Sequence, residues 1–152
     1  MTPATVHASA VLVGARAVLI RGPSGAGKSR LALELIEARR AGTLRFARLV
    51  GDDRVHLQSA GGRLLVRPAQ ALAGLIEQRG TGIVRLDYEP CAVVGLVVDL
   101  NAADAERLPE KNTIEIQGIT LPWLGVASGS AALPGVLARI ISSNATINWQ
   151  PS

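Results

Sequence analysis

Residues 22–29 read Gly22-Pro23-Ser24-Gly25-Ala26-Gly27-Lys28-Ser29, and this stretch decides how the rest of the chain is interpreted. It matches the pattern G-x-x-x-x-G-K-S of a phosphate-binding P-loop. Glycines let the backbone curl so that successive N–H groups converge on phosphate oxygens, and the start of the next helix adds its positive dipole end. In such a loop Lys28 would reach the terminal phosphates of a nucleotide, and the Ser29 hydroxyl would ligate Mg²⁺.

The sequence on either side of the motif predicts the strand and the helix that a P-loop requires. An apolar run, Ala17-Val18-Leu19-Ile20, precedes it and predicts a strand. After it, apolar residues recur with helical spacing from about Ser29 to Arg40, and Gly42 predicts the end of the helix. A glycine-rich turn that matched the motif by chance would need neither neighbour, so the sequence favours a nucleotide site.

The composition predicts a single domain over residues 1–152. The hydrophobic content is 48% and the aromatic content only 3%, so the core must be built from Val, Leu, Ile and Ala, as in an α/β domain. The formal net charge is +4, and Lys28 and Lys111 are the only lysines. The arginines are scattered and have no interleaved aromatic residues, so we expect no nucleic-acid partner.

The cysteine content and the hydropathy of the sequence indicate where in the cell the protein is located. Cys91 is the only cysteine, so no intrachain disulfide forms, and its apolar neighbours predict a buried, inert thiol. The first residues lack a basic region followed by an apolar core, so we expect no secretory leader, and no apolar run reaches the roughly 18 residues of a membrane span. We therefore expect a cytoplasmic protein without a membrane partner.

The remaining elements follow from hydropathy patterns and turn residues. The sequence predicts strands at 7–13, 17–21, 44–50, 54–58, 63–66, 83–86, 91–100, 113–116 and 119–121. A short helical stretch is expected over 69–76, and a second helix over 131–141 with Pro134 in its first turn. Residues 101–111 are expected to form a loop, and residues 144–152 a frayed end.

Asp52 and Asp53 follow the apolar residues Leu49 and Val50, about 24 residues after the P-loop lysine. In P-loop proteins an acidic residue at the end of a neighbouring strand holds Mg²⁺ or its water shell. An adjacent pair can also supply a base, with one carboxylate serving the metal and the other accepting a hydroxyl proton. The alternative is a polar turn, since Asp is a favoured turn residue, but the spacing favours a function.

Two further features are ambiguous from the residues alone. Glu77-x-Arg79-Gly80-x-Gly82 could bind a metal through the glutamate and phosphate through the arginine, but the residues alone favour an ordinary turn after a helix, with Glu77 and Arg79 solvated. His7 stands at the start of the strand expected to pair beside the P-loop strand. A lone histidine at a strand end is more often a surface residue than a catalytic one.

Taken together, these segments resemble the kinase domain of HPr kinase/phosphorylase. That enzyme phosphorylates a serine of the small phosphocarrier protein HPr and reverses the reaction by phosphorolysis. The resemblance covers roughly residues 6–122 and is specific because its motifs occur in order. They are His7-Ala8-x-Ala10-Val11-Leu12-Val13, the P-loop, Leu49-Val50-Gly51-Asp52-Asp53-x-Val55, Glu77-Gln78-Arg79-Gly80-Thr81-Gly82-Ile83, Glu106-Arg107-Leu108 and Ile119-Thr120-Leu121-Pro122.

The resemblance implies a fold, a set of roles and two cofactors. The fold would be a P-loop kinase domain of the phosphoenolpyruvate carboxykinase-like type, with a mixed sheet and flanking helices. Asp52 would be the general base of phosphorylation and the acid of the reverse step, using ATP and Mg²⁺. The active site would include His7, Lys28 and Arg107, while Ser29 and Glu77 would ligate Mg²⁺ and Asp53 would lie beside it. Arg79, Gly80 and Gly82 would contact the nucleotide, and the chain would form a homo-oligomer, a hexamer in long members.

The sequence departs from the long family members in three respects. We expect the chain to lack their N-terminal domain, as in the short form known from alphaproteobacteria. Arg30 follows Lys28-Ser29 where an acidic residue is usual, and no basic residue occurs between Pro122 and Arg139, where long members have a basic loop implicated in HPr docking and phosphorolysis. Two other functions are therefore considered: a kinase of another acceptor, and a module that senses nucleotide without transferring phosphate.

Overall fold

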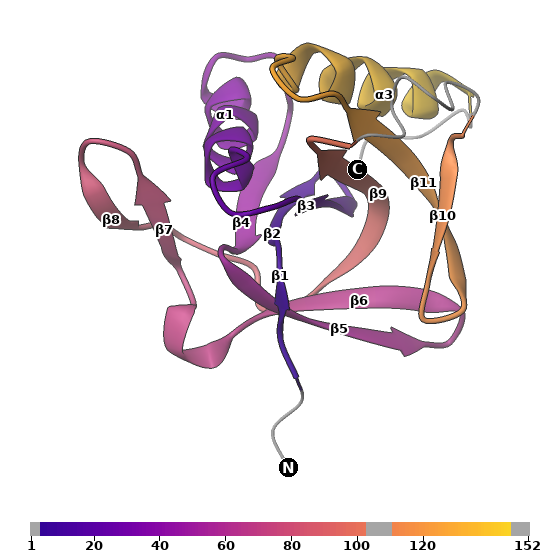
Figure 1. Ribbon diagram of the computed structural model, residues 1–152, viewed down its shortest axis with the longest axis horizontal. Helices are drawn as coiled ribbons and strands as arrows, with labels where there is room; N and C mark the ends of the chain where they lie inside the picture. Colours follow the sequence, from indigo (N-terminus) through magenta and orange to yellow (C-terminus); the bar gives the residue numbers. More distant parts are fainter. Residues whose placement is uncertain (1–3, 103–110, 147–152) are drawn as a thin grey trace.

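The computed structural model describes residues 4–102 and 111–146, with side chains through residue 142. Within these residues the chain forms two α-helices, one 3₁₀ turn and a series of strands (Figure 1). The helices are α1 (Lys28–Arg40) and α3 (Leu133–Thr146), and the 3₁₀ turn is η1 (Gln70–Leu72). The strands are β1 (Val6–His7), β2 (Ser9–Val13), β3 (Arg16–Arg21), β4 (Ala47–Gly51), β5 (Arg54–Ala60), β6 (Arg63–Pro68), β7 (Leu75–Gln78), β8 (Gly82–Arg85), β9 (Ala92–Leu100), β10 (Thr113–Ile116) and β11 (Ile119–Val126).

Nine of the described strands form one mixed sheet in the order β1-β5-β6-β9-β3-β2-β4, with β11 beside β9 and β10 beside β11. Strands β3, β9 and β11 run parallel, and the other pairings are antiparallel. β7 and β8 form a separate hairpin, which Figure 1 shows projecting from the body of the molecule. A mixed sheet with flanking helices is the fold class that the sequence predicts.

The central strands bury side chains on both faces, and so they are apolar throughout. Along β3, Val18 and Ile20 face a core that they share with α1 and α3, while Ala17 and Leu19 face a second core. The second core is closed by β5, β6, β10 and β11. Both helices lie on the same face of the sheet, above the end where β3 runs into α1 (Figure 1).

Several local predictions are confirmed. α1 spans Lys28–Arg40, and Gly42 has the left-handed φ of +85° that ends a helix in the expected way. The hairpin at 54–66 is present but longer, since β5 and β6 extend to Ala60 and Pro68. α3 begins at Leu133 with Pro134 in its first turn, and it continues to Thr146, so residues 144–146 are helical rather than frayed.

Three local predictions are wrong, each because tertiary pairing outweighs the local pattern. The helix expected over 69–76 is a single 3₁₀ turn followed by β7, because Gly74 adopts a φ of +78° and Ile76 is buried as a strand residue. The strand expected over 7–13 breaks at Ala8, since β1 pairs with β5 whereas β2 pairs with β3 and β4. Cys91 is exposed, because it precedes the first residue of β9 instead of lying within it.

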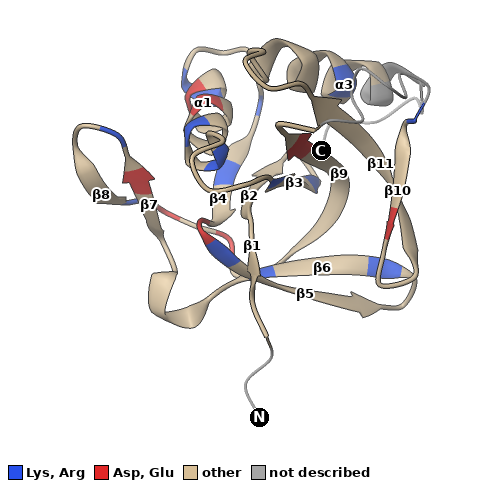
Figure 2. Cartoon of the chain, viewed as in Figure 1, with Lys and Arg blue, Asp and Glu red and all other residues tan. Residues whose placement is uncertain are grey.

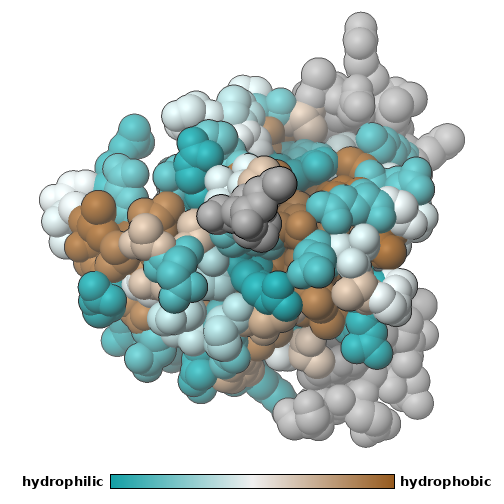
Figure 3. Space-filling model, turned by 90° about the horizontal axis from the view of Figure 1, so that it is seen from below, coloured by the Kyte–Doolittle hydropathy of each residue, from teal (hydrophilic) through white to brown (hydrophobic). Residues whose placement is uncertain are grey.

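No helix in the described part of the chain is long and apolar enough to cross a membrane. The surface seen in Figure 3 mixes polar and apolar side chains, with an apolar group at the end of the molecule where the β7–β8 hairpin projects. Ile83 on this hairpin is 71% exposed.

Candidate functional site

The P-loop links the end of β3 to the start of α1, as the sequence predicts. Gly25 and Gly27 have left-handed φ angles of +82° and +100°, which residues with a side chain rarely adopt. Gly22 is packed tightly: a Cβ there would lie 3.1 Å from the Cβ of Leu100. The loop therefore needs glycine at two positions for its curvature and at a third for its contact with β9.

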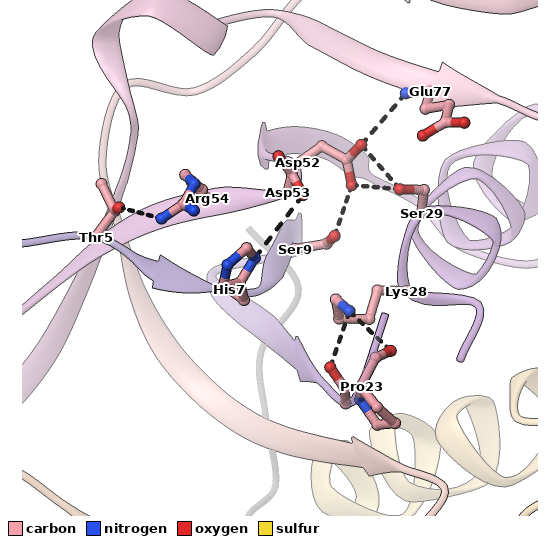
Figure 4. Close-up of polar contacts among 11 residues, drawn as sticks. Thr5, His7, Ser9, Pro23, Lys28, Ser29, Asp52, Asp53, Arg54 and Glu77 are labelled. Atoms are coloured by element: carbon pink, nitrogen blue, oxygen red, sulfur yellow. Dashed lines mark hydrogen bonds and ion pairs between the residues drawn. The ribbon is translucent and has the colours of Figure 1, made fainter. Parts of the chain in front are cut away.

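Lys28, the first residue of α1, folds back across the mouth of the loop (Figure 4). Its Nζ atom donates hydrogen bonds to the carbonyl oxygens of Gly22 at 2.9 Å and Pro23 at 3.1 Å. The ammonium group is thus held beside the backbone that would surround a phosphate, where its positive charge would attract anions.

Asp52 is the buried carboxylate of the site, with only 4% of its surface exposed, and it directly follows β4. Three neutral donors reach it. Ser9 Oγ donates to Oδ1 at 2.6 Å, Ser29 Oγ contacts Oδ1 at 2.8 Å and Oδ2 at 2.9 Å, and the backbone N–H of Glu77 donates to Oδ2 at 3.3 Å. Figure 4 shows these donors converging from β2, α1 and β7.

The charge of Asp52 is not balanced by any ion pair among the described residues. A buried carboxylate is costly unless it is paired or ligates a metal. The Ser29 hydroxyl, which contacts both oxygens of this carboxylate, is also an oxygen ligand of the kind that Mg²⁺ prefers. The chemistry of these donors therefore fits a divalent cation.

Asp53 and His7 lie on the rim of the site rather than in its interior. Asp53 has a left-handed φ of +69°, which turns its side chain away from that of Asp52. His7 Nδ1 is 4.0 Å from Asp53 Oδ1, and the two side chains are 63% and 67% exposed. A backbone hydrogen bond of 3.3 Å from Ala8 N to Asp53 O holds β1 against this turn. The structure thus brings His7 beside Asp53, and Ser29 beside Asp52.

The loop containing Glu77 is a β-hairpin. Glu77 lies on β7, and its backbone N–H, not its carboxylate, makes the hydrogen bond to Asp52. Gly80 and Gly82 have φ angles of +84° and +103°, and they allow the turn between β7 and β8. Arg79 is exposed in that turn, and among the described contacts none joins it to the P-loop. Nucleotide binding by Arg79, Gly80 and Gly82 stays a prediction, as does metal binding by Glu77.

Arg107 and the motif Glu106-Arg107-Leu108 lie outside the described residues. The role of Arg107 in the active site therefore stays a prediction.

Sequence reasoning missed two groups of residues. Ser9, which contacts Asp52, could have been noticed as the only polar side chain in the apolar stretch Ala8–Val13. The second group begins at Arg21, the residue just before the P-loop, which donates two hydrogen bonds of 2.8 Å to the carboxylate of Asp99. Trp123 Nε1 donates to the same carboxylate at 2.7 Å. No local motif marks these three residues, which come from three adjacent parallel strands.

The carboxyl group of Asp99 is kept ionised by this network. Burial alone would raise its pKa, but hydrogen bonds from Arg21 and Trp123 and the charges of Arg21 and Lys111 outweigh burial and lower the pKa below its usual value. Asp99 thus links β3, β9 and β11 through side-chain hydrogen bonds to Arg21, the residue just before the P-loop, and to Trp123.

Comparisons with known proteins agree with this architecture. The family model described as HPr Serine kinase C-terminal domain matches residues 1–127. An HPr kinase/phosphorylase of Streptococcus thermophilus is 38% identical over 135 residues, which cover 80% of this chain and 41% of the relative. Another from Exiguobacterium sp. is 34% identical over 146 residues, covering 88% of this chain and 43% of the relative. The chain spans about two-fifths of the length of these relatives.

The structure of the HPr(Ser) kinase/phosphatase from Coxiella burnetii has a TM-score of 0.75 to this chain at 23% identity. The match covers 95% of this chain and 99% of that chain. This likeness confirms the predicted fold.

Proposed function

The chain belongs to the HPr serine kinase C-terminal domain family, and from this premise we propose that it transfers the γ-phosphoryl group of ATP to a serine of HPr. The observation that carries the proposal is Asp52, a buried carboxylate against the P-loop serine with only neutral donors around it. Such a group supplies what phosphoryl transfer requires at this position, namely negative charge for a cation and a proton acceptor.

Asp52 would act as the general base. It would accept the proton of the acceptor serine while the new O–P bond forms and the bond from the γ-phosphorus to the oxygen of ADP breaks. Ser9 and the Glu77 N–H would keep the carboxylate in place by their hydrogen bonds. In the reverse phosphorolysis, Asp52 would return the proton to the serine oxygen.

Other residues would hold and neutralise the phosphates. Lys28 would exchange its bonds to the Gly22 and Pro23 carbonyls for contacts with phosphate oxygens. Ser29, Asp53 and Glu77 would hold Mg²⁺, which when bound neutralises the negative charge of the phosphates. His7 and Arg107 would complete the active site, and Arg79, Gly80 and Gly82 would contribute nucleotide contacts from the hairpin.

The proposal extends to the setting of the enzyme. HPr would be the protein partner, the reaction would take place in the cytoplasm and regulate the phosphotransferase system, and the chain would form a homo-oligomer. The support for these points is the family relationship.

The decisive experiment is mass spectrometry of HPr from the same organism after incubation with this protein, ATP and Mg²⁺. We expect a gain of one phosphate on a serine, and no gain when a chelator removes Mg²⁺. Binding of ATP without modification of HPr would instead indicate another acceptor. If no acceptor in a cell extract became labelled by radioactive ATP, a nucleotide-sensing module would be indicated.

A further inference from the structure

The outer face of the β5–β6 hairpin carries basic side chains that the proposed transfer reaction does not use. Side chains alternate along the two paired strands, and Val55, Leu64 and Val66 point into the second core. The residues between them therefore point away from that core. The basic residues among them are Arg54, His56, Arg63 and Arg67. We call the surface that these four residues form the basic face.

The positive charge of the basic face has no counterion in the part of the chain that the structure describes. No Asp or Glu occurs from Arg54 through Ile76. None of the four basic side chains forms an ion pair with a described residue. Figure 2 shows blue segments on β6 and no red segment on either strand of the hairpin. An acidic group that balances this charge would have to come from another molecule.

Neutral groups hold two of the guanidinium groups in place. Arg67 Nη1 donates a hydrogen bond to Gln58 Oε1 across the hairpin at 3.0 Å. Arg54 Nη1 donates to Thr5 Oγ1 at 3.2 Å. These bonds orient the side chains but do not neutralise them. Both guanidinium groups therefore keep their full charge for an anionic group from outside.

The register of the hairpin gathers three basic side chains at one end. His56 lies directly opposite Arg67, and the backbone hydrogen bond from Ala69 N to Arg54 O places Arg54 diagonally across from Arg67. Like charges that face each other across two strands destabilise the pairing. The stability of the hairpin therefore does not explain the cluster, whereas carboxylates of a bound partner would offset the repulsion.

The basic face begins at the rim of the proposed active site. Arg54 directly follows Asp53 and is paired with His7 in the sheet register, and Figure 4 shows the three residues on the same side of the site. From there β5 continues for seven residues, which is about 20 Å at the usual rise of a strand. A protein that brings a hydroxyl group to Asp52 has to rest on the surface around the site. The basic face is part of that surface.

We propose that the basic face docks the acceptor protein through Asp and Glu side chains on the surface of that protein. Guanidinium groups bind carboxylates through paired hydrogen bonds, and opposite charges steer two proteins together. Neither β5 nor β6 carries an aromatic side chain on which nucleic-acid bases would stack, and Asp53 beside Arg54 repels phosphate groups. These two features favour a protein over a nucleic acid. The proposal rests on the proposed function and adds the surface that recognises the acceptor.

The first test is an NMR titration of the whole chain with HPr in the absence of nucleotide. We expect saturable shifts at the amides of His56, Gln58, Leu65 and Arg67. Shifts confined to other surfaces would overturn the docking proposal, even if HPr becomes phosphorylated. Shifts caused by an oligonucleotide or by anionic lipid vesicles, but not by HPr, would overturn it as well. Docking on the basic face without phosphorylation of HPr would support this surface and count against the proposed function.

A matched pair of double variants tests which charges matter. Arg63→Gln/Arg67→Gln changes β6, which contributes no residue to the proposed active site. It should raise the KM for HPr about fivefold, since each exposed ion pair contributes little, and should leave kcat and the KM for ATP unchanged. The dissociation constant from the NMR titration should rise by the same factor, which tests docking even if no transfer is detected.

The control is Arg16→Gln/Arg45→Gln, which removes two exposed arginines outside the basic face with the same change in net charge. It should leave all of these constants unchanged. Equal effects of the two double variants would indicate a general charge effect and overturn the assigned surface. A fall in kcat at constant KM for HPr in Arg63→Gln/Arg67→Gln would also overturn docking, because it would mean that the arginines act on transfer.

Ionic strength gives an independent readout. Salt screens charges on exposed surfaces, so added salt should raise the KM for HPr of the wild type more steeply than that of Arg63→Gln/Arg67→Gln. The same salt dependence in both proteins would show that these arginines form no ion pairs with HPr, and would overturn the proposal.

Discussion

Asp52 and Asp99 both stand at the ends of strands close to the P-loop, yet their surroundings differ. Asp99 accepts hydrogen bonds from the guanidinium group of Arg21 and from the indole N–H of Trp123. Asp52 is more deeply buried but receives only two hydroxyls and one backbone amide. The charge of Asp99 is satisfied within the fold, whereas that of Asp52 is available for a cation or a proton. The difference separates a carboxylate that holds strands together from one suited to chemistry.

Replacing Asp52 should have the largest effect on activity. Asp52→Asn keeps the size of the side chain but removes the base, so transfer to HPr should fall by about 10²–10⁴-fold. Nucleotide affinity, measured by calorimetry, should change little. Glu115→Gln, which alters an exposed carboxylate on β10, is the control and should keep full activity. Near-normal transfer by Asp52→Asn would refute the base assignment.

Replacing Asp99 should mainly lower stability. Asp99→Asn breaks the ion pair with Arg21 and should cost about 2 kcal/mol of unfolding free energy, less than a fully buried pair because the Asp99 side chain is 22% exposed. Urea denaturation measures this cost. A loss of transfer as large as that of Asp52→Asn, without loss of stability, would contradict the contrast between the two residues.

The same variant should remove part of the acid sensitivity of the fold. Because the folded-state pKa of Asp99 is lowered, its stabilisation is fully present above the unfolded-state pKa and is lost as pH falls through the folded-state pKa. The unfolding free energies of the wild type and Asp99→Asn should therefore converge below about pH 4, near the usual pKa of aspartate. Urea titrations at a series of pH values measure the convergence, and a constant difference down to strong acid would contradict it.

Removing a single neutral donor from Asp52 should have a smaller effect. Ser9→Ala deletes the 2.6 Å hydrogen bond and should cost about 1 kcal/mol of stability. Transfer should slow by less than in Asp52→Asn, because Ser29 and the Glu77 amide still hold the carboxylate. Ser59→Ala, at an exposed position on β5, serves as the control in both assays. A Ser9→Ala enzyme as inactive as Asp52→Asn would mean that Ser9 itself takes part in the reaction.

The smallest effect is expected for Trp123→Phe, which keeps an aromatic ring but removes the N–H bonded to Asp99. The loss should be about 1 kcal/mol, since Arg21 still binds the carboxylate. Thermal unfolding measures it. A larger loss than that of Asp99→Asn would assign the main role to ring packing instead.

The sequence predicted the parts of the fold that depend on local pattern. The P-loop needs glycines at fixed positions beside an apolar strand and a helix, so residues 17–42 were predicted almost correctly. The segment 69–76 was not, because Gly74 and the burial of Ile76 against neighbouring elements decide its structure. Ser9 and Asp99 were missed for a related reason, since their partners are 43 and 78 residues away in sequence.

β9 pairs with β6 at its start, with β11 at its end and with β3 along most of its length. Its amide hydrogens should consequently be among the last to exchange with solvent, because opening β9 means separating three other strands. The two-residue strand β1, which carries His7, pairs only with β5 in the sheet and should exchange early. The backbone hydrogen bonds of β9, which supports the P-loop, would thus stay closed while those of β1 at the rim of the site open and close many times.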